Sequence, residues 1–398
     1  MMPASSHSGT DSRFELFAST ALGLESIAAG ELKSLGVRGR QEIGGVAFAE
    51  DLDRLYQANL WLRTASRVLA RLGRFHASTF YELERRAKKL PWEKFLPASG
   101  GGPVRLRVTC RKSRLYHSDA VAERVLSAIA GSASRVIEAS GDGLDDEGED
   151  ADNEAQLFIV RIAHDQVEIS ADSSGELLHR RGYRQEIAKA PLRETLAAAM
   201  VLASGWRTGE PLLDPMCGSG TIPIEAALIA RGIAPGAERK FQFMRWPTFD
   251  EKRWEVILEN ARSSTTRAIE TISGSDRDAG AIGAARRNAE RAGVAEAIQF
   301  SENAISETIA GLDDAGTGWV LTNPPYGVRI GEGEDLRNLY ARLGAELGTK
   351  PGWRLGVLTS DTGLVGQTRL SMVSRFDTRN GGIPVSFMVS EKPGRKRG

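Results

Sequence analysis

The hydrophobic positions of the first 70 residues alternate between strand spacing and helix spacing. Short apolar runs are typical of strands, and apolar residues three and four apart are typical of an amphipathic helix. Asp51 stands directly before one helical stretch, where its carboxylate can cap the first turn. The order predicts a small α+β unit at residues 14–70. Its strands are expected at 14–18 and 45–48, and its helices at 27–35 and 51–60.

A second α+β unit is predicted at residues 71–172. Between 105 and 109 apolar side chains alternate with basic ones, which predicts a strand with one apolar and one basic face. The segment 141–154 contains eight acidic side chains and no basic one, so it is expected to form a solvated loop. The other elements of the unit are expected to be a helix at 118–130 and strands at 157–162 and 166–170.

From about residue 190 onward, the pattern changes to long helices separated by short, wholly apolar runs. Such runs are typical of strands buried on both faces, and the helices between them are typical of parallel connections. We therefore predict an α/β domain at 173–390, with a doubly wound parallel sheet. Its helices are expected at 192–203, 221–231 and 281–292, and its first strand at 211–213.

Composition narrows the class of protein. The chain has 398 residues, a length typical of two or three domains. Of these residues 41% are hydrophobic and 26% charged, a composition typical of globular proteins. Its 52 basic residues balance 52 acidic ones, so a nucleic-acid partner would have to be held by local basic patches. Cys110 and Cys217 are too few for a disulfide framework or a thiolate zinc site, which favours the reducing cytoplasm.

The start of the chain lacks the apolar stretch of a secretion signal, so secretion is not expected. Residues 1–13 are polar and rich in serine, and are expected to be disordered. No apolar run of 18 residues occurs, so a membrane span is not expected. Residues 391–398 form a basic tail that we expect to be solvated. His76, His164 and His179 lack metal-ligand spacing, and we expect no metal site.

A glycine-rich loop follows the first strand of the predicted α/β domain and leads directly into a helix. Its sequence is Asp-Pro-Met-Cys-Gly-Ser-Gly-Thr at 214–221. Loops in this position bind nucleotides, because Gly218 and Gly220 leave the backbone bare for a ligand. The loop lacks the Gly-Lys-Ser/Thr ending of a phosphate cradle, which argues against an NTPase.

Polar residues also follow the next two candidate strands. Asp276 ends one of them, where a carboxylate can accept hydrogen bonds from both hydroxyls of a ribose. Asn303 follows the other and can accept a hydrogen bond from an adenine amine, although asparagine is equally common as a turn residue.

The most specific motif is Asn323-Pro324-Pro325-Tyr326, at the end of an apolar strand. Two consecutive prolines make a rigid extended turn and remove backbone donors, so acceptors dominate this corner. A planar amino group can donate to the side-chain oxygen of Asn323 and to the carbonyl of Pro324. Tyr326 can stack on the attached ring.

Together these motifs resemble those of class I S-adenosylmethionine-dependent amino-methyltransferases. More closely, the chain resembles the THUMP-domain RNA guanine-N2 methyltransferases, and the resemblance is most specific over 180–330. The motifs that carry it are Gly182-Tyr183-Arg184, Ala190-Pro191-Leu192-Arg193-Glu194, the loop at 214–221, Arg239-Lys240-Phe241 with Trp246-Pro247, and Asn323-Pro324-Pro325-Tyr326-Gly327.

The resemblance implies a fold and an activity. It implies a ferredoxin-like unit at 14–70, a THUMP RNA-binding domain at 71–172 and a Rossmann-like methyltransferase domain at 173–390. It also implies methyl transfer from S-adenosylmethionine to the exocyclic N2 of a guanosine in RNA. The Asp-Pro-Met-Cys form of the loop is more similar to members that act on 23S rRNA than to those that act on tRNA. The chain is expected to lack a second methyltransferase domain and to be a monomer or weak dimer.

Site residues are carried over onto the matching positions. The catalytic residues are expected to be Asn323, Pro324, Pro325 and Tyr326. At position 303 the family often has Asp, so Asn303 keeps an acceptor but loses a charge. The cofactor-binding residues are expected to be Pro191, Asp214, Pro215, Met216, Cys217, Gly218, Ser219, Gly220, Asp276, Arg277, Asn303, Ala304 and Asn323.

A basic stretch in the second unit is the candidate RNA surface. Tyr116 and His117 follow it and could stack on bases. A solvated strand face would have the same composition, so both interpretations remain open. The residues expected to contact RNA are Arg105, Arg107, Arg111, Lys112 and Arg114.

Other functions remain compatible with parts of the sequence. The Asn-Pro-Pro-Tyr corner also suits adenine N6 in DNA or the side-chain amide of a protein glutamine. A tRNA guanine, or a non-catalytic role as an RNA-binding assembly factor, is a further alternative. The N-terminal half favours RNA, and the intact motifs favour an enzyme. Cys217 and the cluster of Phe241, Phe243 and Trp246 are expected to be structural.

Overall fold

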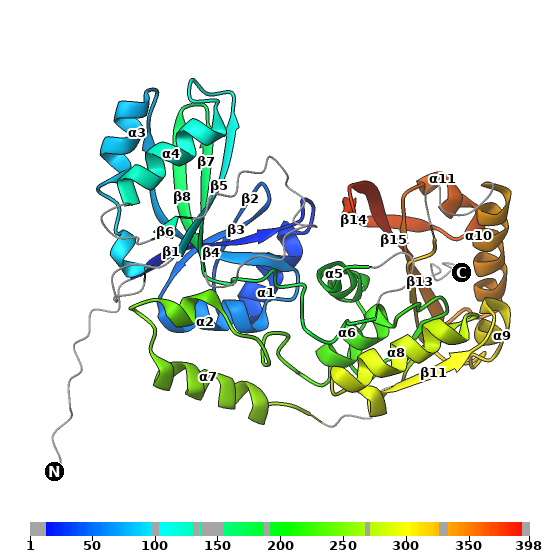
Figure 1. Ribbon diagram of the computed structural model, residues 1–398. Coiled ribbons are helices and arrows are strands. Elements are labelled where there is room, and N and C mark those ends of the chain that lie inside the picture. Colours follow the sequence, from blue (N-terminus) through cyan, green and yellow to red (C-terminus); the bar gives the residue numbers. More distant parts are fainter. Residues whose placement is uncertain are drawn as a thin grey trace, which may run out of the picture.

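The computed structural model describes residues 13–96, 103–129, 135–136, 155–186, 192–266, 271–325 and 333–391. The chain forms two lobes, each built on its own β-sheet, with the N-terminal lobe on the left in Figure 1 and the C-terminal lobe on the right. The acidic segment at 141–154, expected to form a loop, lies outside the described residues.

An eight-stranded sheet of order β2-β3-β1-β4-β8-β7-β5-β6 forms the N-terminal lobe. The long strand β4 pairs with both β1 and β8, so the two α+β units predicted on either side of residue 70 share one continuous sheet. The strands are β1 (Phe14–Thr20), β2 (Arg40–Glu42), β3 (Gly45–Glu50), β4 (Ala65–His76), β5 (Pro103–Arg111), β6 (Arg135–Val136), β7 (Gln156–Ala163) and β8 (Gln166–Asp172).

Four described helices of the N-terminal lobe, together with the helix at Glu251–Ser263, contribute to the apolar core on one face of this sheet. Alternation along the strands sends Val104, Leu106 and Val108 of β5 into this core. Asp51 caps the second helix by accepting from the backbone N–H of Arg54, as the sequence predicts. The helices are α1 (Glu25–Ser34), α2 (Leu52–Trp61), α3 (Phe80–Ala87) and α4 (Ser118–Ile129).

The C-terminal lobe contains the predicted doubly wound sheet. Its order is β11-β10-β9-β12-β13-β15-β14; the first five strands are parallel, and β15 is antiparallel to β13 and β14. The strands are β9 (Leu212–Asp214), β10 (Ile272–Asp276), β11 (Ile298–Glu302), β12 (Gly318–Thr322), β13 (Trp353–Thr359), β14 (Met372–Asn380) and β15 (Ile383–Ser390).

Helices cover both faces of this sheet, which confirms the Rossmann-like α/β prediction. Leu212 of β9 packs with helices α5, α6 and α8, whereas the next residue, Leu213, packs with α9 and α10 on the opposite face. The helices of this half of the chain are α5 (Glu194–Ser204), α6 (Thr221–Ala230), α7 (Glu251–Ser263), α8 (Ala279–Arg291), α9 (Ile305–Ala310), α10 (Gly333–Gly348) and α11 (Thr362–Val365).

Buried arginines join the two lobes. Arg63 of the N-terminal lobe donates hydrogen bonds to the carbonyl of Leu228, in the last turn of α6, and to that of Ile233, just after the helix ends. Arg181, in the segment between the lobes, contacts Glu225 of α6 and donates to the carbonyl of Arg63. Helix α7 extends under the N-terminal lobe and packs against α2 (Figure 1). The lobes therefore share buried polar contacts rather than only a linker.

Two further findings bear on the class of protein. None of the described helices is long and apolar enough to cross a lipid bilayer. Within the same part of the chain, no three His, Cys, Asp or Glu side chains gather closely enough to ligate a metal ion.

Candidate active site

The carboxyl ends of four neighbouring strands meet at one edge of the C-terminal sheet. Asp214 ends β9, Asp276 ends β10, Asn303 follows β11 and Asn323 follows β12. All four side chains line one cavity of about 740 Å³. Ligands bind at this edge in open α/β sheets, because the strand order reverses there. The sequence motifs at 214–221, 276, 303 and 323 therefore belong to one site.

The glycine-rich loop is tied to the neighbouring strand by its backbone. The N–H of Cys217 donates to the carbonyl of Ser275 at 2.9 Å. The N–H of Gly218 donates to Oδ2 of Asp276 at 3.0 Å, and the other oxygen of this carboxylate accepts from the N–H of Asp278 at 3.1 Å. These bonds fix the loop and orient the Asp276 carboxylate at the cavity wall.

Gly220 occupies the N-cap position of α6 with a φ of +83°. A Cβ atom at this position would lie 3.0 Å from Cβ of Ala285 and 3.2 Å from the ring of Phe300. Both the left-handed backbone and the lack of space therefore require glycine.

Gly220→Ala is expected to lower the free energy of unfolding by about 1–3 kcal/mol more than Gly293→Ala does. Gly293 has a φ of +69° and open space around its Cβ direction, so the control shares the backbone strain but not the crowding. Urea denaturation of the two variants measures the difference. Equal losses would show that the Gly220 site can absorb a methyl group.

Asp214 lies at the base of the cavity and is fully buried within the protein. Its Oδ1 accepts hydrogen bonds from the N–H of Met216 at 3.1 Å and from the hydroxyl of Thr322 at 2.9 Å. Burial raises the pKa of Asp214 to about 7, and the nearby charge of Asp276 acts in the same direction. A cationic group bound in the cavity would favour the ionised carboxylate.

Asn323 stands where β12 leaves the sheet. Its side-chain oxygen Oδ1 is buried, and no donor within the described residues reaches it. A buried carbonyl without a donor is costly, so a bound group that donates to it would remove this cost. Pro324 and Pro325 follow and supply no backbone N–H, so the donors that a non-proline backbone would offer are absent from this corner of the cavity.

Most of the predicted cofactor-binding residues line the cavity. Gly220 and Pro324 stand beside it, and Pro191 and Tyr326 lie outside the described residues. The predicted residues that line the cavity are Asp214, Pro215, Met216, Cys217, Gly218, Ser219, Asp276, Arg277, Asn303, Ala304, Asn323 and Pro325.

Sequence reasoning missed the apolar wall of the cavity. Leu336 and Leu339 reach it from α10, and Ile305 reaches it from the start of α9. Leu336 and Leu339 are three residues apart, which predicts that they share one face of a helix. This spacing does not tell whether that face lines a cavity or packs in the core. Arg342 lies one turn further along α10 and also lines the cavity. The wall suits a flat apolar ring.

The predicted RNA-contacting residues divide into two groups. Arg111, Lys112 and Arg114 are exposed at the end of β5. Their loop is held to the β7–β8 turn, where Oδ1 of Asp165 accepts from the N–H of Arg114 at 2.7 Å. Arg107 is half-buried on β5.

Arg105 differs from the expectation, because it is only 8% exposed. The strand alternates as predicted, but Arg105 lies opposite Leu157 near the start of β5, whereas the exposed Arg111 is the last residue of this strand. Strand alternation sets the face of a residue, and neighbouring segments set its exposure. The Arg105 side chain is therefore not a surface contact for RNA.

The residues expected to be structural are buried in the core. Phe241, Phe243 and Trp246 are at most 3% exposed and pack beneath the N-terminal sheet. Burial raises the pKa of the Cys217 thiol well above its ordinary value, which removes its nucleophilic form.

Comparisons with known proteins agree with this site. A family model described as an RMKL-like methyltransferase domain matches residues 181–387, and one described as the RlmL ferredoxin-like domain matches 15–69. The chain is 37% identical to the ribosomal RNA large subunit methyltransferase K/L of Syntrophotalea carbinolica, over 96% of this chain. The match spans only 54% of that relative, so the chain corresponds to about half its length.

Two shorter proteins match along nearly their full length. The putative RNA methyltransferase slr0064 of Synechocystis sp. is 35% identical over 94% of this chain and 96% of its own length. The solved structure of SMU.472, a putative methyltransferase complexed with SAH, is 29% identical, with a TM-score of 0.83 over 96% of this chain and 98% of that one.

The cavity fits S-adenosylmethionine in chemistry. It offers a bare glycine loop, carboxylate and amide acceptors at three strand ends, and an apolar wall for an adenine ring. The unfilled acceptor at Asn323 adds a place for an amino group of a second molecule. From this site and from matches that extend along most of its length, we conclude that the chain belongs to the RMKL-like methyltransferase family and is an enzyme that uses S-adenosylmethionine as its methyl donor.

Proposed function

We propose that this enzyme methylates the exocyclic N2 of a guanosine in RNA, and that the RNA is 23S ribosomal RNA. The observation that carries the proposal is the buried Oδ1 of Asn323, which lacks a donor among the described residues and belongs to a residue that lines the cofactor cavity. The match to a ribosomal RNA methyltransferase along 96% of the chain supports the choice of RNA. The THUMP assignment of residues 71–172 and the monomer or weak-dimer state are part of the same proposal.

The protein's contribution to the reaction is positioning. When bound, S-adenosylmethionine supplies an activated methyl group on a sulfonium. Asn323 Oδ1 and the Pro324 carbonyl would accept the two hydrogens of the guanine amine, which holds the nitrogen toward the cofactor and increases the electron density on it. Tyr326 would stack on the base. The proton released on methylation passes to water.

The cofactor is proposed to lie across the strand ends. Asp276 would accept from the ribose hydroxyls, and Asn303 and Ala304 would contact the adenine edge. The bare backbone at Gly218 would approach the methionine part, with Asp214 as a nearby negative charge. Leu336 and Leu339 would cover the adenine ring. Pro191 and the remaining loop residues complete the proposed set.

RNA would also contact the N-terminal lobe. Arg111, Lys112 and Arg114 form an exposed basic loop, and Tyr116 beside them is 68% exposed. Such a combination binds phosphates by charge and bases by stacking. Arg107, on the same strand, would extend this surface. The target base would have to leave its stack to enter the cavity.

The test is nucleoside mass spectrometry of RNA from a strain that lacks the gene. Loss of N2-methylguanosine from 23S rRNA, and its return when purified enzyme and S-adenosylmethionine are added, is the expected result. Loss from tRNA alone would move the substrate to tRNA. Loss of N6-methyladenine from DNA or of methylglutamine from protein, with 23S rRNA unchanged, would contradict the proposal.

The affinity for S-adenosylmethionine is expected to depend on pH through Asp214. With its pKa raised to about 7, the carboxyl of the empty enzyme is protonated below pH 7, and a bound cation favours loss of this proton. Binding must then expel a proton, so affinity should fall about tenfold for each pH unit below 7.

Calorimetry between pH 5.5 and 8, in buffers of different ionisation heat, measures both the affinity and the proton release. In Asp214→Asn the carboxyl is absent, so the pH dependence should be flat. A wild-type affinity that does not change across this range would show that Asp214 is already ionised in the empty enzyme.

A further inference from the structure

The segment between the lobes, residues 173–184, is folded around a buried cation. The guanidinium of Arg239 donates to the carbonyls of Glu176 at 2.7 Å and Leu177 at 2.9 Å, and also to that of Arg180. Burial lowers the pKa of Arg239 to about 10, so it remains charged at neutral pH. Three hydrogen bonds from one rigid fork hold this segment in a defined conformation.

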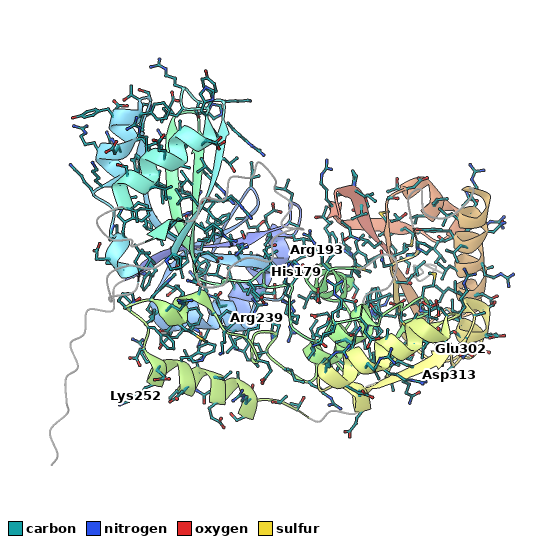
Figure 2. The ribbon with its side chains drawn as sticks, viewed as in Figure 1. His179, Arg193, Arg239, Lys252, Glu302 and Asp313 are labelled. Carbon is teal, nitrogen blue, oxygen red and sulfur yellow. The ribbon has the colours of Figure 1, made fainter. Side chains whose placement is uncertain are left out.

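The basic side chains of this segment differ in exposure. Arg181 is 8% exposed and points into the lobe junction, toward Glu225. His179 and Arg180 are half-buried instead. Figure 2 shows His179 close to Arg193, in the middle of the molecule between the two lobes.

The four charges that act most strongly on His179 are all positive. Burial, and after it the cations Arg193, Arg184, Arg181 and Arg180, together lower the pKa of His179 to about 3. Two of these arginines have carboxylate partners: Arg184 pairs with Glu194 at 3.0 Å, and Arg181 pairs with Glu225. An anion at this place would meet a concentrated positive potential.

This basic cluster adjoins the cofactor cavity. Leu192 lines the cavity, and Arg193 is the next residue in the chain. Arg184 donates a hydrogen bond to the carbonyl of Leu192 at 3.1 Å, which connects the interlobe segment to the cavity wall. A nucleotide whose base occupies the cavity keeps its phosphates outside, and the cluster is connected to the cavity wall through Leu192.

We propose that His179, Arg180 and Arg193 bind a backbone phosphate of the RNA strand whose base enters the cavity. The proposal rests on RNA being the substrate and adds a contact next to the reacting nucleotide, separate from the basic loop at 111–114. Arginine forks match phosphate oxygens, and a neutral imidazole can donate one N–H to them. The phosphate would also raise the pKa of His179, because it supplies the missing negative charge.

The first test compares charge-removing variants. Arg180→Gln and Arg193→Gln are each expected to raise KM for in vitro transcribed 23S rRNA by about tenfold and to reduce the slope of log affinity against log salt by about one. The kcat value and the affinity for S-adenosylmethionine should stay close to wild type. Arg193→Lys, which keeps the charge, should recover part of the loss. Thermal melting checks that each variant is folded.

Arg207→Gln is the matched control. Arg207 is exposed in the turn between α5 and β9, at the amino ends of the parallel strands and so on the opposite edge of the sheet. The substitution removes the same charge without altering the cluster. The KM of this variant for 23S rRNA and its salt slope should therefore equal those of the wild type. Equal effects in Arg207→Gln and Arg193→Gln would reduce the cluster to general electrostatic attraction and overturn the proposal.

The second test reads His179 directly and separates the two proposals. Histidine NMR signals, assigned with His179→Gln, should show the pKa of His179 rising when 23S rRNA or polyuridylate binds. Inorganic phosphate should have much less effect; an equal effect would indicate a site for a free anion and overturn the RNA assignment. An unchanged His179 in the RNA complex would also overturn it. If the wild-type enzyme fails to methylate 23S rRNA, the proposed function is wrong, but the polyuridylate experiment still tests the phosphate site.

Discussion

Replacing Asn323 by alanine is expected to lower kcat by about 10²–10³-fold, the usual cost of removing one positioned hydrogen-bonding group from an active site. The affinity for S-adenosylmethionine should change little. The reason is the geometry of the corner. Oδ1 of Asn323 is buried and accepts no hydrogen bond within the described chain, so a substrate amine is the group that would donate to it. Single-turnover methyl transfer and calorimetry with the cofactor measure the two quantities.

Two variants make this test specific. Asn323→Asp keeps acceptor oxygens but adds a charge, and should retain more activity than Asn323→Ala. Asn260→Ala removes an exposed asparagine from α7, away from the cavity, and should have wild-type activity. A parallel loss of cofactor affinity and turnover in Asn323→Ala would mean that the residue supports the cavity rather than the amine.

The sequence predicts the order of strands and helices correctly where the local pattern of residues is strong. The glycine loop, the two carboxylates and the Asn-Pro-Pro corner each stand at the end of a short strand, and parallel strands bring their carboxyl ends to one edge. Sequence spacing thus predicts one site from motifs more than 100 residues apart. The Rossmann-like order follows from the same alternation of strands and helices.

Other parts of the structure depend on tertiary contacts that a sequence pattern does not show. Strand β4 mixes arginines with apolar residues because it crosses the centre of the sheet, where Arg71 pairs with Glu42 and Glu168 on the open face. Arg105 has a regular strand position but is buried by its surroundings. The cations around His179 come from the interlobe segment and the start of α5, so their proximity is a property of the fold.

Asp276 provides the second large expected effect. Asp276→Ala should weaken S-adenosylmethionine binding by about 10²–10⁴-fold, because hydrogen bonds to a charged acceptor contribute about 1.5–3 kcal/mol each and the ribose offers two hydroxyls. The control is Glu302→Ala, at the end of β11. Glu302 lies beside Asp276 in the parallel register but is exposed, and its removal should not alter binding (Figure 2).

Two roles of this carboxylate must be separated, because it also accepts from the backbone N–H groups of Gly218 and Asp278. A double-mutant cycle with 2′-deoxy-S-adenosylhomocysteine does so. If Asp276 binds the ribose, removing the 2′-hydroxyl weakens binding to the wild type but has little further effect on Asp276→Ala. If Asp276 only holds the loop, the deoxy analogue weakens binding to both proteins equally. The first outcome is expected, since both carboxylate oxygens retain a free lone pair at the cavity wall after serving the two amides.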